Sequence, residues 1–317
     1  MKILLVGAGA VGQVYGRHLQ KAGHDVSFLV KEKYEAEARG GYVLYPLNES
    51  GRRCPVRFEG FGVLVRPAGG FDQVWLCFSS TALRGPLTDE IARTLGAATL
   101  ICLQPGVDDR DYLAARVPSD QIVSGLISLI SYQAPLPGEV VPAPGVAYWF
   151  PPMGPSLFDG EPGRTKTVVD ALRGGGCPAR KQRQLAVQGG LGGAILMPIL
   201  LALEGAGWTF AGVRRSPLLP LAVAAARESA TVVAAGAGVR PPAALRLLCP
   251  NALRLVSRVA PHVIPLDVET YLEYHFTKVG DQTRFMVETY LRLGRERGIA
   301  TPALATLARQ VLEGAFR

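Results

Sequence analysis

The chain of 317 residues lacks the cysteine and histidine patterns that hold disulfide scaffolds and metal centres together. Its five cysteines are far apart, with no C-x-x-C pair, and its four histidines show no metal-ligand spacing. An odd cysteine count, together with an opening apolar run too short for a signal peptide, argues against a disulfide framework. We therefore expect no disulfide scaffold and neither a structural nor a catalytic metal.

Runs of one charge, low-complexity tracts and internal repeats are absent as well. The net charge of +8 comes from scattered basic residues, and the densest groups are 180–183 and 214–215, without interleaved aromatics. This pattern is unlike that of a nucleic-acid-binding surface, so we expect no nucleic-acid partner. The positive balance instead suits an enzyme whose cofactor and small substrate are both anions.

One apolar segment, residues 185–203, has the length of a membrane span and carries no charge. It also contains Gln188, four glycines and Pro198, which lower its hydropathy and interrupt helix continuity. We therefore expect a buried core helix, no membrane partner and a cytoplasmic protein.

The predicted secondary structure changes at the glycine-rich segment 174–178. Before it, apolar strand-like runs alternate with helical patterns, and after it the patterns are almost entirely helical. The chain is also long for a single hydrophobic core. We predict an α/β protein with an N-terminal Rossmann domain, a doubly wound parallel sheet, over residues 1–176. A second, all-helical domain over 177–317 would serve substrate binding and a possible homodimer contact.

The expected elements follow from hydrophobic periodicity. Apolar runs predict strands at 2–6, 26–30, 73–78, 98–103 and 122–130, and alternation within 131–160 predicts hairpin strands at the sheet edge. Helical patterns cover 10–21, 81–95, 108–115, 166–173, 182–212, 218–235, 243–259, 268–278, 283–297 and 302–316.

A glycine motif lies between the first predicted strand and the first predicted helix. It reads G-x-G-x-x-G and consists of Gly7, Ala8, Gly9, Ala10, Val11 and Gly12. In such a turn the first glycine permits the tight bend, the second lets the backbone approach a pyrophosphate, and the third lets the helix pack on the strand. The helix N-terminus then offers N–H groups to the phosphates. The motif predicts dinucleotide binding.

The end of the second strand distinguishes the two nicotinamide dinucleotides. NAD sites place an acidic residue there for the ribose 2′-OH, and NADP sites offer a cation to the 2′-phosphate. Here the strand is followed by Lys31, with Glu32 one residue later. The sequence favours NADP(H), although a surface lysine with no such role would look the same.

The whole pattern resembles the ketopantoate reductase (2-dehydropantoate 2-reductase) family. The resemblance is carried by the glycine turn, Lys31, the boundary near Cys177, and the segments 183–187 (R-Q-L-A-V) and 298–302 (G-I-A-T-P). It implies reduction of a 2-oxo acid with NADPH. It also implies a lysine on the first helix of the second domain beside the carbonyl oxygen, and a glutamate on a later helix that holds a substrate hydroxyl.

This sequence departs from the family at those positions. The family lysine falls on Gln184 and the glutamate on Gln282, while two family asparagines fall on Gln188 and Gly192. Glutamine donates a hydrogen bond but is neither a cation nor an acid at neutral pH. Two further positions are implied to border the cofactor: Ser79, in place of a lysine after the fourth strand, and Gln104, in a Q-P-G segment where the family has Q-N-G.

A polar, aromatic segment at 271–282 is a candidate for a relocated catalytic site. On one continuous helix, Tyr271, His275, Lys278 and Gln282 would share a face. We therefore take Lys278 as a candidate cation for an anionic substrate, His275 as a candidate proton donor and Gln282 as their neighbour. The alternative is structural: Gly280 ends the helix, and Lys278 only favours its C-terminus.

Three functions remain open from the sequence. The first is an NADP-dependent reductase that transfers hydride to a changed 2-oxo acid, ketone or imine. The second is an authentic 2-dehydropantoate 2-reductase whose catalytic roles are redistributed. The third is a catalytically silent NADP(H)-binding protein that acts as a sensor or partner subunit.

Overall fold

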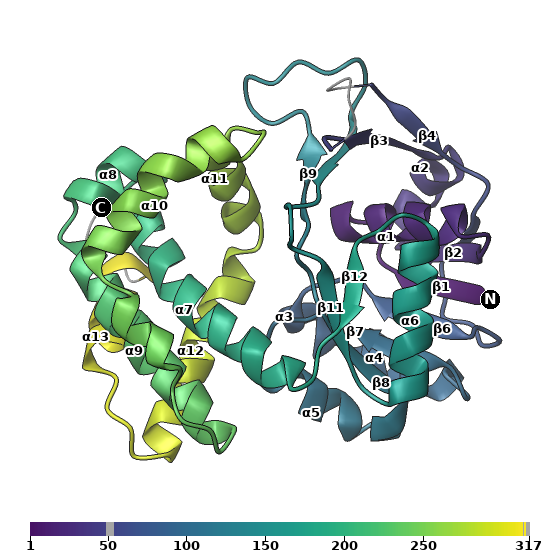
Figure 1. Cartoon of the computed structure of the whole chain (residues 1–317). Helices are drawn as coiled ribbons and strands as arrows, with labels where there is room; N and C mark the ends of the chain where they lie inside the picture. Colours follow the sequence, from purple (N-terminus) through teal and green to yellow (C-terminus); the bar gives the residue numbers. More distant parts are fainter. Residues whose placement is uncertain (49–53, 313, 315–317) are drawn as a thin grey trace. The chain divides into compact units, whose positions relative to one another are not determined.

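A mostly parallel sheet forms the centre of the N-terminal part of the chain. The protein's structure, a computed structural model, describes residues 1–48, 54–312 and 314. The strand order is β12-β11-β8-β7-β6-β1-β2-β5, and its segment from β8 to β5 is entirely parallel (Figure 1). This segment has the order of a Rossmann domain. The strands are β1 (Lys2–Val6), β2 (Asp25–Leu29), β5 (Gly62–Leu64), β6 (Gln73–Leu76), β7 (Thr99–Cys102), β8 (Ile122–Leu126), β11 (Ser156–Asp159) and β12 (Ala179–Lys181).

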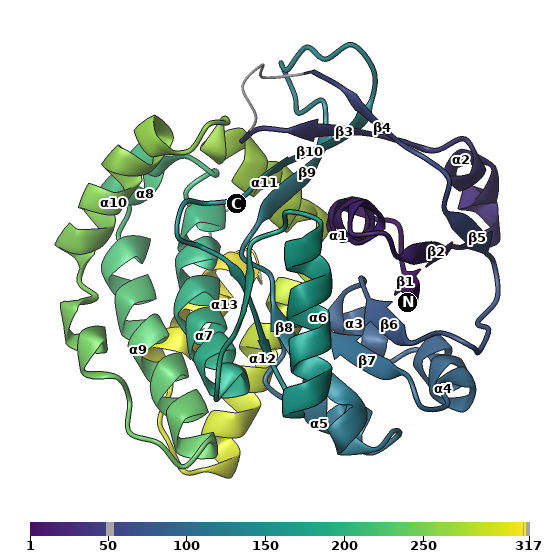
Figure 2. The same cartoon turned by 45° about the vertical axis from the view of Figure 1, so that its right-hand side comes forward.

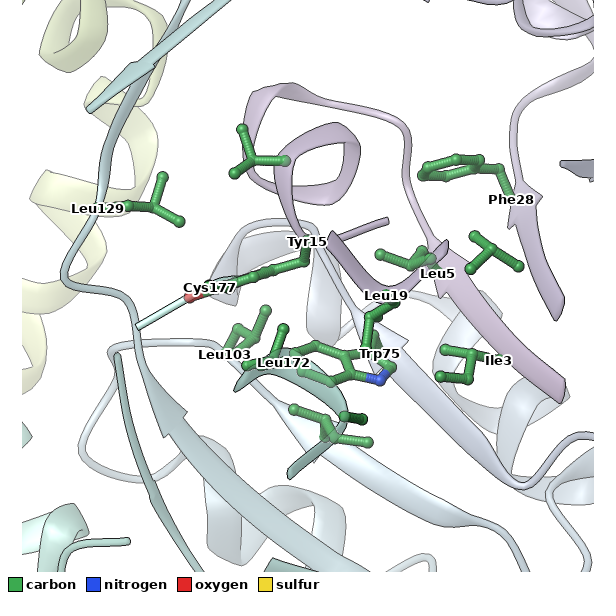
Figure 3. Close-up of a cluster of buried hydrophobic side chains, with 14 of the residues drawn as sticks. Ile3, Leu5, Tyr15, Leu19, Phe28, Trp75, Leu103, Leu129, Leu172 and Cys177 are labelled. Atoms are coloured by element: carbon green, nitrogen blue, oxygen red, sulfur yellow. The ribbon is translucent and has the colours of Figure 1, made fainter. Parts of the chain in front are cut away.

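Helices cover both faces of this sheet because its strands are apolar on both sides. Ile3 and Leu5 of β1 pack toward α1 (Ala10–Lys21) and α6 (Pro162–Gly174), in the cluster drawn in Figure 3. Leu4 and Val6 point to the opposite face, which α3 (Ser80–Leu83), α4 (Pro86–Thr94) and α5 (Asp109–Ala114) cover. The doubly wound sheet predicted from the sequence is confirmed.

The helix expected over 81–95 is in fact two helices. α3 ends at Leu83, and α4 begins at Pro86, which follows Gly85. Proline has no N–H to donate to the preceding turn, so it starts a helix more readily than it continues one.

Of the strands expected within 131–160 at the edge of the main sheet, only the one at 156–159 joins that sheet; the hairpin at 130–149 belongs to a separate sheet, so that part of the prediction was wrong. This second sheet has the order β4-β3-β10-β9, and β10 runs antiparallel to β9 but parallel to β3. Figures 1 and 2 show it beside α1, where Arg17 donates to the Tyr148 hydroxyl at 2.8 Å. The strand expected over 122–130 accordingly ends at Leu126. The strands are β3 (Tyr42–Pro46), β4 (Val56–Phe58), β9 (Ile130–Ala134) and β10 (Gly145–Trp149), and short helices lie at η1 (Glu32–Tyr34), α2 (Glu35–Arg39) and η2 (Ser119–Gln121).

The chain divides into two units, Met1–Ala186 and Val187–Arg317. The division lies ten residues after the boundary expected at 176/177, because β12 at 179–181 pairs with β11 and belongs to the first unit.

All the regular elements described after β12 are helices. Glu228 of α9 accepts hydrogen bonds from the N–H groups of Ala303 and Leu304, at 3.1 and 2.9 Å, and so caps α13. The predicted helix 182–212 is two helices, α7 and α8. The elements are α7 (Leu185–Gly205), α8 (Phe210–Arg215), α9 (Leu218–Gly236), η3 (Ala243–Leu247), α10 (Pro250–Val263), α11 (Val268–Lys278), α12 (Gly280–Glu296) and α13 (Pro302–Leu312).

Two of these helices, α7 and α9, are long and apolar enough to cross a membrane by length and composition alone. In their most apolar 18-residue windows, 50% of the residues of α7 and 61% of those of α9 are buried. Helices that form the core of a protein pass the same test, and this burial is typical of them.

Candidate functional site

The glycine turn lies between the carboxyl end of β1 and the start of α1, and two of its glycines have no room for a side chain. Gly7 adopts a φ of +103°, and a Cβ on it would lie 2.9 Å from the carbonyl oxygen of Cys77, the residue after β6. A Cβ on Gly12 would lie 2.2 Å from the carbonyl oxygen of Gly7. The turn therefore brings together β1, β6 and α1, and it does so only with glycine at these positions.

Gly9 differs from these two because the space beside it is open. It is the N-cap of α1, and a Cβ built on it would meet no described heavy atom within 4 Å. It has no side chain to cap the helix, and the first turn of α1 contains no acidic residue. The N–H groups of that turn have no intrahelical acceptors, and the helix dipole makes this end positive. The turn thus has the space and the donors that a pyrophosphate requires.

Lys31 lies two residues after β2 and is exposed. It is the N-cap of η1, and no ion pair joins its ammonium group to any residue within 1–48, 54–312 or 314. The neighbouring Lys33 instead lies over the Tyr34 ring, with its Nζ 4.8 Å from the ring centroid. Lys31 is therefore available to an anion that approaches the end of β2.

The side chains of Ser79 and Gln104 form hydrogen bonds within the protein. The Ser79 hydroxyl oxygen caps α3 by accepting from the Ala82 N–H at 3.2 Å. The Gln104 amide donates to the carbonyl oxygens of Leu76 and Phe78, at 3.0 and 2.7 Å, and the residue is only 8% exposed. These side chains shape the loops after β6 and β7, so any contact with a cofactor here would fall mainly to the backbone.

The sequence interpretation missed Asp109, which connects the same two loops. This carboxylate is fully buried and accepts from the Ser80 hydroxyl at 2.6 Å, the Gly106 N–H at 2.7 Å and an Arg84 Nη at 2.6 Å. The other Arg84 Nη binds Asp108 at 2.8 Å. An aspartate three residues after a turn glycine was the available signal, because aspartate commonly accepts from nearby backbone N–H groups in turns.

Gln184, which the sequence resemblance predicts at the position of the family lysine, is exposed and immediately precedes α7. It has a φ of +57°, a left-handed conformation that is uncommon for residues other than glycine. The next residue, Leu185, donates its N–H to a carboxylate oxygen of Asp159 at 3.1 Å. The position is thus held in an unusual conformation but carries no charge.

The single helix face predicted for 271–282 is not formed, so that expectation was wrong. α11 ends at Lys278 and α12 begins at Gly280, with Val279 between them at φ −111° and ψ 26°. Gln282 therefore lies on a different helix from His275 and Lys278. Lys278 is exposed, and its Nζ is 6.0 Å from the centroid of the Tyr274 ring.

His275 packs between aromatic rings. Its ring centroid lies 5.4 Å from that of Tyr271 and 4.9 Å from that of Phe276. Burial, and secondarily the charge of Lys278, lower the pKa of His275 below its ordinary value. The imidazole is thus mainly neutral at pH 7, which disfavours the role of proton donor that its ordinary titration range suggested.

Within 1–48, 54–312 and 314, no group of three or more His, Cys, Asp and Glu side chains is arranged to hold a metal ion.

Known proteins resemble this chain in sequence over much of its N-terminal part and in fold over nearly its whole length. The model of the family described as ketopantoate reductase PanE/ApbA matches residues 3–154. Two curated relatives align with the chain. The uncharacterized oxidoreductase YkpB of Bacillus subtilis is 30% identical over 127 residues, 40% of each chain. The 2-dehydropantoate 2-reductase of a Nostoc species is 31% identical over 130 residues, 41% of this chain and 40% of that one. The matched region thus spans about two fifths of either relative's length.

Solved structures extend the similarity in fold to nearly the full length. A ketopantoate reductase from Ralstonia eutropha superposes with a TM-score of 0.77 at 18% identity, covering 99% of this chain and 98% of that one. The 2-dehydropantoate 2-reductase from Geobacter metallireducens gives 0.73 at 21%, covering 99% and 100%. A D-mandelate dehydrogenase in complex with NADH gives 0.72 at 16%, covering 99% and 98%. The predicted resemblance to ketopantoate reductases is confirmed, in sequence over residues 3–154 and in fold over nearly the whole chain.

Proposed function

We propose that this protein is an NADP(H)-dependent reductase that acts in the cytoplasm on a small anionic 2-oxo acid, ketone or imine. The observation that carries the proposal is the open N-terminus of α1 at Gly9, next to two glycines that admit no side chain. Such a turn after the first strand of a Rossmann sheet is built for a pyrophosphate. The D-mandelate dehydrogenase with a similar fold is described with NADH.

In this proposal, different residues of the first unit bind different parts of the cofactor. The backbone N–H groups of residues 9–12 would bind the pyrophosphate, and Lys31 would bind the 2′-phosphate that distinguishes NADP from NAD. Asp109 would keep the loops after β6 and β7 in place beside it. When bound, a nicotinamide cofactor supplies the hydride for reduction of a carbonyl or imine carbon.

Within α11, the exposed Lys278 is the cation that would bind the carboxylate of an anionic substrate or stabilise a developing alkoxide. The neutral His275 would act on the substrate as a hydrogen-bonding group. Gln184 and Gln282 would donate hydrogen bonds but supply no proton.

A catalytically silent NADP(H)-binding protein is the second candidate, favoured by a specific observation. The resemblance implies glutamines where the family has its lysine and glutamate, and the pKa of His275 is lowered. Loss of a general acid typically costs about 10²- to 10⁴-fold in rate. A sensor or partner subunit would keep the turn at Gly9 and need no acid.

Two measurements on the purified chain test these proposals. Cofactor fluorescence measures the affinity for NADPH and NADH, and we expect tighter NADPH binding that Lys31→Ala weakens and the neighbouring Lys33→Ala does not. NADPH oxidation against ketopantoate and a panel of 2-oxo acids then measures turnover, which Lys278→Ala should reduce. Binding without turnover on any substrate would favour the silent protein. Failure to bind either cofactor at millimolar concentration would refute both candidates.

A further inference from the structure

A cavity of about 370 Å³ lies wholly within the helical unit, away from every residue assigned a role above. α8 and α10, which lie side by side in Figures 1 and 2, form most of its wall, and the start of α11 completes it. Its volume is within the range of small-molecule sites. Its lining consists of Phe210, Ala211, Arg214, Ser257, Arg258, Pro261, His262 and Glu269.

Two arginines dominate the charge of this cavity. Arg214 is half-buried and fixed by Ser257, to whose carbonyl oxygen one Nη donates at 3.1 Å. A guanidinium has five N–H donors, so most of those of Arg214 remain for a ligand. Arg258 is exposed, and no hydrogen bond or ion pair joins its side chain to any residue that the structure describes. Two arginines thus line one space, one anchored by Ser257 and one without a hydrogen-bond or ion-pair partner among the described residues.

The single acid in the lining, Glu269, forms a hydrogen bond to the backbone of α8. Its carboxylate accepts the backbone N–H of Phe210 at the start of α8. His262 lies one helical turn beyond Arg258 on α10 and adds a third nitrogen-bearing side chain. Two arginines against one glutamate leave the formal charge of the lining positive.

The surrounding sequence reinforces this balance. From Ser229 to Leu266 the chain contains no aspartate or glutamate, but it contains four arginines. Exposed arginines usually have acidic neighbours on the same surface, and here the whole segment supplies none. The remaining wall, Phe210, Ala211 and Pro261, is apolar.

From this lining we propose that the cavity binds a small organic dianion, a phosphate or a dicarboxylate carried on a compact apolar body. The forked donors of Arg214 and Arg258 match the oxygen geometry of either acidic group. Phe210 and Pro261 contact the apolar body. The site is independent of the proposed reductase function, because none of its residues belongs to the glycine turn or to the 275–282 segment.

Calorimetric titration of the full chain with phenyl phosphate, at low salt and without nicotinamide cofactor, tests the site. We expect saturable binding at one site per chain, and no binding of benzyl alcohol, which has the ring but no charge. A parallel titration with phthalate distinguishes the two sources of negative charge: tighter phenyl phosphate binding would identify a phosphate ligand, and tighter phthalate binding a dicarboxylate.

Matched arginine variants connect the binding to the cavity. Arg258→Gln is expected to weaken binding at least tenfold, and Arg214→Gln likewise if its melting temperature shows that it folds. Arg246→Gln, an exposed arginine of the same acid-free segment outside the cavity, should leave the affinity unchanged. Absence of saturable binding, an Arg258→Gln protein that binds like the wild type, or equal weakening by Arg246→Gln would each overturn the proposal.

Discussion

The Nδ1 atom of His18 lies 2.7 Å from the carbonyl oxygen of Gly175. This hydrogen bond joins α1 to the residue that caps the C-terminus of α6. The two segments are in close contact there, because a Cβ on Gly175 would lie 1.7 Å from the His18 carbonyl oxygen. The other ring nitrogen, Nε2, is buried with no hydrogen-bond partner among the described residues. The rings of Tyr148 and Phe150 pack edge-on against the imidazole. The imidazole therefore belongs in this core only in its neutral form.

His18 should make the protein less stable in acid. Burial lowers the pKa of His18 from 6.5 to about 4, so the unfolded chain binds this proton at a higher pH than the folded chain does. We expect the contribution of His18 to the unfolding free energy to be constant above pH 6.5 and to fall as the pH decreases toward 4. At the lower limit the loss amounts to about 3 kcal/mol.

Urea unfolding between pH 4 and 7 measures this effect in the wild type and in His18→Asn, which retains a donor toward Gly175 but does not titrate. The variant should lose much of the pH dependence. His262→Asn, at an exposed histidine, is the control and should keep it. Identical pH profiles for all three proteins would contradict the prediction.

The glycine turn allows stability and cofactor binding to be separated. In Gly12→Ala the new methyl group meets the Gly7 carbonyl oxygen, so we expect a loss of about 2 kcal/mol or more in unfolding free energy. In Gly9→Ala the methyl group enters open space, so stability should change by about 1 kcal/mol or less. NADPH affinity should nevertheless fall about tenfold or more, because the methyl group blocks the approach of the pyrophosphate. Unchanged NADPH affinity in Gly9→Ala would place the cofactor elsewhere.

The glycine turn could be predicted from the sequence because a short motif fixes both its backbone and its neighbours. The strands β1, β2, β6, β7 and β8 could be predicted as well, because buried parallel strands are continuous apolar runs. β5 could not, since it has only three residues, and Gly62 begins it. β3 and β10 pair across about a hundred residues of sequence, and no local pattern records that contact.

The 271–282 segment shows where periodicity is insufficient. The polar residues at 271, 275, 278 and 282 do follow helical spacing. One helix nevertheless ends at Lys278 and the next begins at Gly280, with Val279 between them. Burial then lowers the pKa of His275, which spacing alone cannot indicate. Local pattern thus identified the polar residues, whereas their chemistry depends on tertiary packing.

Loss of the Asp109 charge should destabilise the protein more than loss of the neighbouring Asp108 charge. Asp109→Asn replaces one carboxylate oxygen with an NH₂ group that must face a donor, either the Ser80 and Gly106 pair or Arg84. We expect a loss of about 3 kcal/mol in unfolding free energy at pH 7. The adjacent Asp108→Asn, whose side chain is 39% exposed, should cost about 1 kcal/mol or less. Equal losses measured by urea unfolding would show that the Asp109 network is not specifically stabilising.

The cysteines should differ in reactivity because the pKa values of three of their thiols are raised. Burial raises the pKa of Cys77, Cys102 and Cys177 to about 12, so at pH 8 they are almost entirely protonated and unreactive. Cys54 is exposed. Iodoacetamide at pH 8 should therefore label Cys54 in the native protein and leave those three unlabelled, as peptide mass spectrometry would show. All should react in guanidinium chloride, and native labelling of Cys102 as fast as Cys54 would contradict this packing.

Gln184 offers a test by gain of function. The sequence resemblance matches this exposed residue to the family lysine, and Gln184→Lys introduces a cation there without changing a buried contact. If the protein is a reductase whose alkoxide stabilisation is weak, the added ammonium group should raise kcat for NADPH-dependent reduction of ketopantoate by about tenfold or more. Gln182→Lys adds the same charge two residues earlier and should have no such effect. An equal rise in both variants would indicate general electrostatic attraction of the substrate, and no rise in Gln184→Lys, combined with loss of turnover in Lys278→Ala, would place the chemistry at α11.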